Sequence, residues 1–159
     1  MAGSVIKYGT MPDGQVVHAV TIGTGSVSAK IITYGATIAD LHAPDSSGVV
    51  GDVLLGFTNL AGWTGPGNHC FNCIIGRTAG RNDAKGIDVD GTHYDLPGND
   101  GGNPETDSIK SGTNLHGGME LNTVVWTVAK SSAEAVTLEY CSPDLTNPGK
   151  YPGEVRGSV

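Results

Sequence analysis

The sequence is poor in charged residues, which make up 16% of its 159 residues, against a usual share of about 25%. Glycine, by contrast, occurs 25 times. Surface helices need a charged face, and each glycine inside a helix costs roughly 1 kcal/mol, so this composition excludes a coiled coil or a helix bundle. Hydrophobic residues make up 38% of the chain, enough to fill a core, which excludes an acidic disordered tail. On length alone we expect one compact domain.

Basic residues are also few, since nine lysines and arginines stand against 16 acidic residues and give a formal net charge of −7. Nucleic acids and anionic membrane surfaces are bound by clustered cations, so we expect neither as a partner. There is no apolar run of about 18 residues that could span a bilayer. Residues 1–10 lack the apolar stretch of a signal peptide. We therefore expect a cytoplasmic protein.

Cysteine occurs three times, and an odd count favours reduced thiols over a disulfide framework. Cys70 and Cys73 form a C-x-x-C motif, which invites a redox or metal interpretation. However, residues 70–75 have the apolar character of a strand, in which positions three apart lie about 10 Å from each other. A disulfide needs Cα atoms within about 7 Å, and Cys141 adds no second ligand pair for a metal. We interpret both residues as ordinary strand cysteines.

Short alternating segments separated by turn signals recur along the chain. Asp90-Gly91, between two three-residue apolar-polar segments, is the strongest hairpin signal in the sequence. Large apolar residues recur at every second position in two later segments, as in strands. They are Val124, Trp126 and Val128, which alternate with Val125, Thr127 and Ala129, and Val136, Leu138 and Tyr140, which alternate with Thr137, Glu139 and Cys141. This period of two over many short segments predicts an antiparallel all-β fold.

Two stretches are not predicted as strands. Residues 59–68 and 97–113 are rich in glycine, asparagine, proline and aspartate, and we expect both to be long loops. Loops longer than about 12–15 residues in a compact domain are usually functional or disordered.

Two clusters carry side chains suited to chemistry. Arg77 and Arg81 follow the apolar residues 70–75, and their guanidinium groups could bind paired oxygens. His116, next to two glycines, could donate or accept a hydrogen bond or transfer a proton near neutral pH. Taken singly, the arginines are better explained by a surface salt bridge, and His116 by an ordinary turn.

When the two clusters are taken together with the neighbouring segments, in their order along the chain, a functional interpretation is favoured over the ordinary one. With matching gaps, the ordered set resembles the aldose 1-epimerase (galactose mutarotase) family across essentially the whole chain. The segments that carry the resemblance are Tyr34-Gly35-Ala36-Thr37-Ile38, Pro44-Asp45, Asp52-Val53-Leu54-Leu55-Gly56-Phe57, Ile75-Gly76-Arg77, Ala79-Gly80-Arg81, Asp90-Gly91, Tyr94, Leu96, Asn114-Leu115-His116-Gly117-Gly118, Trp126, Ser142-Pro143-Asp144 and Tyr151-Pro152-Gly153.

The resemblance implies a large β-sandwich of mostly antiparallel strands and an activity without metal or organic cofactor. Family members interconvert the α and β anomers of free aldoses. One group removes the proton of the anomeric hydroxyl while another protonates the ring oxygen, and the opened sugar recloses after rotation about C1–C2. Such general acid–base catalysis contributes about 10²–10⁴-fold in rate.

The resemblance also assigns individual residues. Arg81 matches the family arginine that hydrogen-bonds the sugar, and His116 matches the first active-site histidine, which binds the substrate near the reacting centre. The family usually has asparagine before that arginine, where this chain has Gly80. Neighbouring Asn82 is a candidate substitute for that contact, although strand geometry would point it to the other face.

The family's second histidine, its sugar-binding aspartate and its glutamate base all lie beyond the segments matched here. We expect residues 1–159 to form the N-terminal portion of one such domain, truncated to about half. A β-sandwich cut at this point would expose strand edges, so we expect a complementing polypeptide, self-association or a larger assembly. Two hypotheses follow: an epimerase for a hexose such as glucose or galactose, or a non-catalytic carbohydrate-binding or structural subunit.

Overall fold

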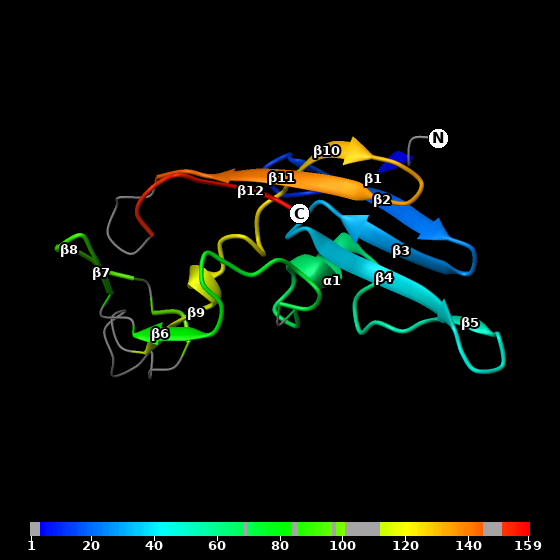
Figure 1. Ribbon diagram of the computed structural model, residues 1–159, viewed down its shortest axis with the longest axis horizontal. Coiled ribbons are helices and arrows are strands. Elements are labelled where there is room, and N and C mark those ends of the chain that lie inside the picture. The colour runs from blue at the N-terminus through cyan, green and yellow to red at the C-terminus, as the bar shows by residue number, and fades with distance from the viewer. Residues whose placement is uncertain (1–3, 69, 84–85, 97, 101–111, 145–150) are drawn as a thin grey trace. The chain divides into compact units, whose positions relative to one another are not determined.

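A computed structural model describes residues 4–68, 70–83, 86–96, 98–100, 112–144 and 151–159. The described chain is built mainly from antiparallel β-strands (Figure 1). It divides into two compact units, each described by itself below. The first unit comprises Met1–Ile74, Asn122–Tyr140 and Ser158–Val159, and the second comprises Ile75–Leu121 and Cys141–Gly157. No helix in the described ranges is long and apolar enough to cross a membrane.

The first unit contains a five-stranded antiparallel sheet in which the spatial order follows the sequence order. Neighbouring strands are joined by short connections, as in a meander, and the outer strands are β1 and β5. The sheet is made of β1 (Val5–Thr10), β2 (Val16–Thr24), β3 (Val27–Ile32), β4 (Thr37–Pro44) and β5 (Val50–Asp52).

Alternation along β2 places one set of its side chains in the core. Val17 and Ala19 are almost completely buried, as is Ile32 at the end of β3. A short helix, α1 (Leu60–Thr64), completes this cluster with the buried Trp63. The Trp63 indole N–H donates to the Tyr8 hydroxyl at 3.1 Å, so burial of the ring leaves its polar atom satisfied.

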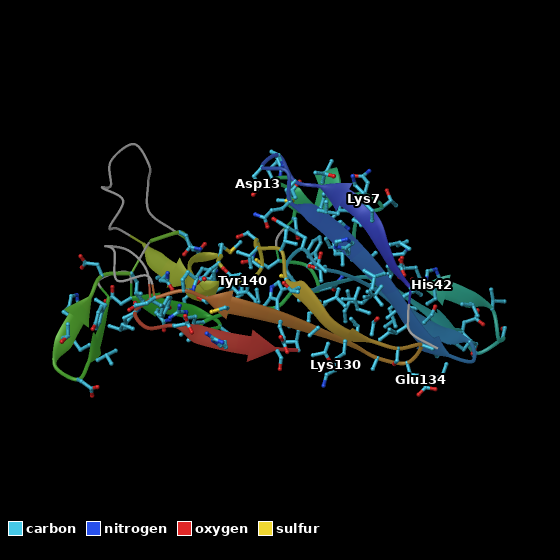
Figure 2. The ribbon with its side chains drawn as sticks, turned by 90° about the horizontal axis from the view of Figure 1, so that it is seen from above. Lys7, Asp13, His42, Lys130, Glu134 and Tyr140 are labelled. Carbon is cyan, nitrogen blue, oxygen red and sulfur yellow. The ribbon has the colours of Figure 1, made fainter. Side chains whose placement is uncertain are left out.

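A second segment of the first unit joins this core from far along the chain. Backbone hydrogen bonds of 2.8 Å run from the Gly35 N–H to the Val124 carbonyl and from the Trp126 N–H to the Thr33 carbonyl. The chain continues into a hairpin of β10 (Thr127–Ser131) and β11 (Val136–Ser142), with Glu134 in its turn (Figure 2). β12 (Val155–Ser158) is the third strand of this sheet.

The connection after β5 is held by one carboxylate. Asp52 Oδ1 accepts hydrogen bonds from the backbone N–H groups of Leu41 and Leu54, each at 3.1 Å. These donors favour the ionised form and lower the Asp52 pKa below its usual value. The carboxylate thus replaces ladder hydrogen bonds where the strand pairing ends.

The second unit consists of two small antiparallel pairs. β6 (Arg81–Asp83) pairs with β9 (Thr113–Leu115), and β7 (Ile87–Val89) pairs with β8 (Thr92–Tyr94). Asp90 and Gly91 connect β7 to β8 and both have positive φ, as a two-residue type I′ hairpin turn requires. The predicted hairpin is confirmed. A 3₁₀ turn, η1 (His116–Gly118), follows β9 directly.

Residues 70–75 do not form the predicted strand. Cys70 and Asn72 have φ of 61° and 55°, in the left-handed region, so this segment turns back on itself. Its ends are tied to the first sheet, because the Ile38 N–H donates to the Asn72 carbonyl and the Ile74 N–H to the Gly35 carbonyl. Of the apolar side chains that suggested a strand, Phe71 packs against the core of the first unit.

The predicted loop over 59–68 also differs, since it contains α1. Asn59 caps the helix by accepting a hydrogen bond from the Gly62 N–H on its side-chain oxygen at 3.0 Å. Most of the predicted loop over 97–113 lies outside the described residues. At its described ends, Asp100 and Thr113 form an isolated antiparallel bridge.

Candidate functional site

The pairing of β6 with β9 brings the two principal predicted site residues to adjacent backbone positions. Arg81 lies opposite Leu115 in the register, and His116 follows Leu115 in the chain. The His116 N–H donates to the Gly80 carbonyl at 2.9 Å. Residues 35 apart in sequence are thus neighbours across one short ladder.

The imidazole of His116 is oriented by the same neighbour. The Gly80 N–H donates to His116 Nδ1 at 3.2 Å, so this nitrogen acts as the acceptor of the ring. In neutral imidazole only one nitrogen carries the proton, and it must then be Nε2. His116 therefore presents an N–H donor at Nε2 on a half-buried side chain.

Arg81 is the exposed cation of the site. Its side chain is 61% exposed, and its Nε donates to Asp100 Oδ2 at 2.5 Å. Among the described residues, Asp100 is the one side-chain partner of this guanidinium. Asp100 was not singled out in the sequence. Asp100 is held by its backbone bridge to Thr113. The polar composition of this segment does not predict such a bridge.

Asn82 lies on the opposite face of β6, as its strand position predicts. Its amide donates to Thr78 Oγ1 at 2.8 Å and to the Tyr151 hydroxyl at 3.2 Å. Tyr151 in turn donates to the fully buried Asn114 at 2.7 Å. The Asn82 side chain belongs to a polar network inside the second unit, and its contact with a sugar stays a prediction.

Arg77 differs from Arg81 although both were singled out as a pair. Its side chain is only 9% exposed. Its guanidinium donates to the Ser142 hydroxyl and to the carbonyls of Pro143, Pro152 and Gly153 at 2.6–2.9 Å. Arg77 therefore fastens two separate segments of the second unit and is a structural cation.

Two glycines set the backbone on which His116 lies. Gly80 has φ of +75°, and a Cβ placed on it would meet no atom within 4 Å. Gly117 has φ of +70°, and a Cβ there would lie 2.2 Å from the Gly76 carbonyl oxygen. Glycine at position 80 thus allows the backbone its positive φ, whereas glycine at position 117 leaves room for the Gly76 carbonyl oxygen.

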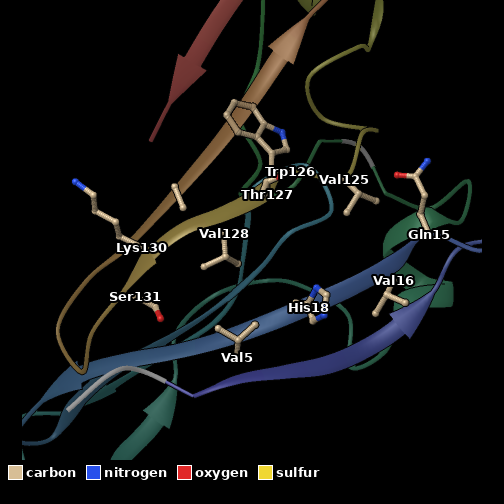
Figure 3. A pocket seen from close by; sticks show the side chains of 11 residues that line it. Val5, Gln15, Val16, His18, Val125, Trp126, Thr127, Val128, Lys130 and Ser131 are labelled. Carbon is tan, nitrogen blue, oxygen red and sulfur yellow. The ribbon is translucent and has the colours of Figure 1, made fainter.

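The first unit carries a separate groove of about 610 Å³ that none of these residues lines. Val5, Val16 and His18 form one wall, and residues from Val125 to Ser131 form the other (Figure 3). Val5 and Val16 are 44% and 37% exposed. Besides its valines, the groove is lined by the polar side chains of Gln15, His18, Thr127, Lys130 and Ser131. Among the described residues, no cluster of three or more His, Cys, Asp or Glu side chains could hold a metal ion.

The sequence matches a protein-family model described as aldose 1-epimerase over residues 18–159. The chain belongs to the aldose 1-epimerase family. Galactose mutarotase of Rattus norvegicus is 32% identical over 151 residues, which cover 94% of this chain and 40% of that protein. Galactose mutarotase of Homo sapiens is 31% identical over the same coverage. This aldose 1-epimerase family chain therefore spans about 40% of the length of the curated relatives it matches.

Solved structures show the fold of the family chain. The GalM/aldose epimerase homologue from C. elegans superposes with a TM-score of 0.75 at 23% identity, covering 90% of this chain and 41% of that one. Galactose 1-epimerase from Lactobacillus acidophilus gives a TM-score of 0.70 at 22% identity, covering 96% and 42%. The predicted antiparallel all-β fold of the galactose mutarotase type, represented by less than half of its length, is confirmed.

Proposed function

We propose that this chain acts with a complementing polypeptide to interconvert the α and β anomers of a free hexose, such as glucose or galactose. The observation that carries the proposal is the pair of hydrogen bonds between Gly80 and His116, which fixes a donor at Nε2 beside the exposed Arg81. Family membership supplies the class of reaction.

In this proposal the two residues hold the sugar by complementary donors. The terminal Nη groups of Arg81 donate to sugar hydroxyls, for which a planar guanidinium is well suited. His116 Nε2–H donates to an oxygen next to the anomeric carbon, whose charge grows as the ring opens, and so lowers the barrier. Asp100 keeps the Arg81 side chain in place through Nε. The acid and the base that move protons come from the complementing polypeptide.

Exposed apolar surface in the first unit supports the need for such a polypeptide. Val53 and Leu55, just beyond the outer strand β5, are 61% and 72% exposed. The groove beside β1 is open as well. Outer strands and apolar grooves are surfaces on which further strands pack. We also propose a cytoplasmic location, because all three cysteines are thiols.

Polarimetry tests the proposal. Freshly dissolved α-D-glucose or α-D-galactose is followed with the chain alone and with the remaining part of a full-length relative, such as the rat protein, added as a second polypeptide. We expect faster mutarotation in the second case, and a loss of about 10²–10³-fold in His116→Ala, because one donor to the developing charge is removed. His93→Ala, an exposed histidine of the same unit paired with Asp88, is the matched control and should retain activity. No acceleration under either condition refutes the proposal.

A non-catalytic carbohydrate-binding or structural subunit is the second candidate. It is favoured by the absence of a carboxylate contact to the His116 ring among the described residues, since an imidazole in proton transfer is usually oriented by one. For a binding subunit, galactose shifts the NMR signals of Arg81 and His116 without any effect on mutarotation. For a structural subunit, those signals stay unchanged while His116→Ala leaves assembly intact.

A further inference from the structure

Cys70 and Cys73 lie closer together than their sequence pattern indicates. The left-handed backbone at Cys70 and Asn72 folds residues 70–73 into a tight turn, and the first and fourth Cα atoms of such a turn lie within about 7 Å of each other. A disulfide joins residues whose Cα atoms lie about 4.4–6.8 Å apart, so the backbone of this turn brings the two cysteines within reach of one. The four-residue turn thus has the geometry of a dithiol pair.

The turn is fastened on both sides, so the thiols stay next to each other. Asn68 Oδ1 accepts a hydrogen bond from the Phe71 N–H at 3.1 Å, and the Asn72 side chain donates to the Leu55 carbonyl at 2.9 Å. With the backbone bonds of Asn72 and Ile74 described above, these contacts fix the backbone of the turn within the first unit. Ordering of this kind raises the effective concentration of one thiol at the other.

The surroundings differ between the two sulfurs. The buried Asn122 side chain donates an N–H to the Cys70 sulfur at 3.5 Å, a contact that favours its thiolate. Burial raises the pKa of both thiols, and that of Cys73 reaches about 11. The nearby Tyr34 hydroxyl has its pKa raised too, by burial first and by the two thiols second. Cys70 is therefore the more readily ionised member of the pair.

We propose that Cys70 and Cys73 form a modification site at which a peroxide oxidises the pair to an intramolecular disulfide. The Cys70 thiolate attacks one peroxide oxygen, breaks the O–O bond and becomes a sulfenic acid while hydroxide leaves. The Cys73 thiol then attacks the Cys70 sulfur, and its proton leaves with the sulfenic oxygen as water. Two thiols and one hydrogen peroxide thus give one disulfide and two waters.

Peptide mapping after treatment with hydrogen peroxide tests the proposal. Cleavage after Lys30 and Arg77 places both cysteines on one tryptic peptide, whereas Cys141 falls on another. We expect the peptide with both cysteines to lose the mass of two hydrogen atoms and to resist alkylation until dithiothreitol is added. Cys141→Ser should oxidise at an unchanged rate. Bonds to Cys141 or to a second chain, or two thiols that remain alkylatable, overturn the proposal.

Single variants test the order of the steps. In Cys73→Ser the sulfenic acid formed at Cys70 has no resolving thiol and should be trapped by dimedone, whereas Cys70→Ser should give at least about tenfold less adduct. The rate of disulfide formation should rise about tenfold for each pH unit between about 7 and 9, because the thiolate reacts. Equal trapping in both variants, or a rate that does not change with pH, refutes the mechanism. Circular dichroism of each variant verifies that it is folded.

Discussion

Replacing Arg77 tests whether its guanidinium fastens the second unit. Hydrogen bonds from a charged donor contribute about 1.5–3 kcal/mol each. The contacts to Ser142 Oγ at 2.6 Å and to the Pro152 carbonyl at 2.9 Å are partly buried, whereas those to Pro143 and Gly153 are exposed. Water can replace the exposed pair, so we count only the first two. Arg77→Met should then lower the free energy of unfolding by about 3–6 kcal/mol.

Urea denaturation and hydrogen exchange together measure this loss. Protection should fall most at residues 142–144 and 151–157, which the guanidinium joins. Arg77→Lys is the matched control, because it keeps the charge but cannot reach separate acceptors with a planar fork. It should lose about half as much. A change below about 1 kcal/mol in Arg77→Met would mean that water replaces all of these bonds, and the structural role assigned to Arg77 would be refuted.

Three further predictions concern the glycines of the site and one carboxylate. Gly117→Ala should cost about 3 kcal/mol or more in thermal unfolding, because its Cβ would overlap the carbonyl oxygen of Gly76. Gly80→Asn should cost less than about 1 kcal/mol, since asparagine tolerates positive φ, and in the complemented protein it should speed mutarotation by adding the polar group usual in the family. Asp52 has a lowered pKa when folded, so its stabilising effect is present above the unfolded pKa and disappears as the pH falls through the folded one. Asp52→Asn should therefore flatten the acid limb of the stability–pH curve.

Each of these three predictions is compared with a variant at another position of the chain. Gly91→Ala has a similar positive φ but open space around its Cβ, so it should cost only about 1–2 kcal/mol. Equal losses at positions 91 and 117 would refute the steric explanation. A large loss in Gly80→Asn would show that the backbone there tolerates no side chain. Glu134→Gln, at an exposed carboxylate in the turn between β10 and β11, is the comparison for Asp52, and identical acid limbs in the two variants would contradict the assigned role.

Local signals in the sequence predicted the strands well where a turn residue and an alternating pattern coincided. Asp90-Gly91 and the alternation in residues 136–141 are examples. Residues 70–75 were predicted wrongly, because cysteine and asparagine at positive φ leave no mark in an apolar stretch. Helix α1 was missed because it is one turn long and has a glycine at its centre. Asn59 as a cap was the available signal.

For the candidate site, position in the sequence indicated which residues matter but not what each one contacts. Arg81 and His116 meet because β6 pairs with β9, which the sequence pattern did not predict. Arg77 and Arg81 are the same residue type and lie four positions apart, so the sequence alone does not distinguish their roles. Only the fold, through acceptors 65–76 residues away, makes the first a buried structural cation and leaves the second exposed.

The bonds that join Thr33 and Gly35 to residues 124–126 have a consequence for synthesis on the ribosome. At about 5–20 residues per second, residue 125 is added roughly 5–20 s after Tyr34. The meander of β1–β5 forms from local hairpins within microseconds to seconds. During that interval the nascent sheet lacks Val125, which packs against its core. The uncovered side of Tyr34 is then a surface that chaperones can bind until the later segment arrives.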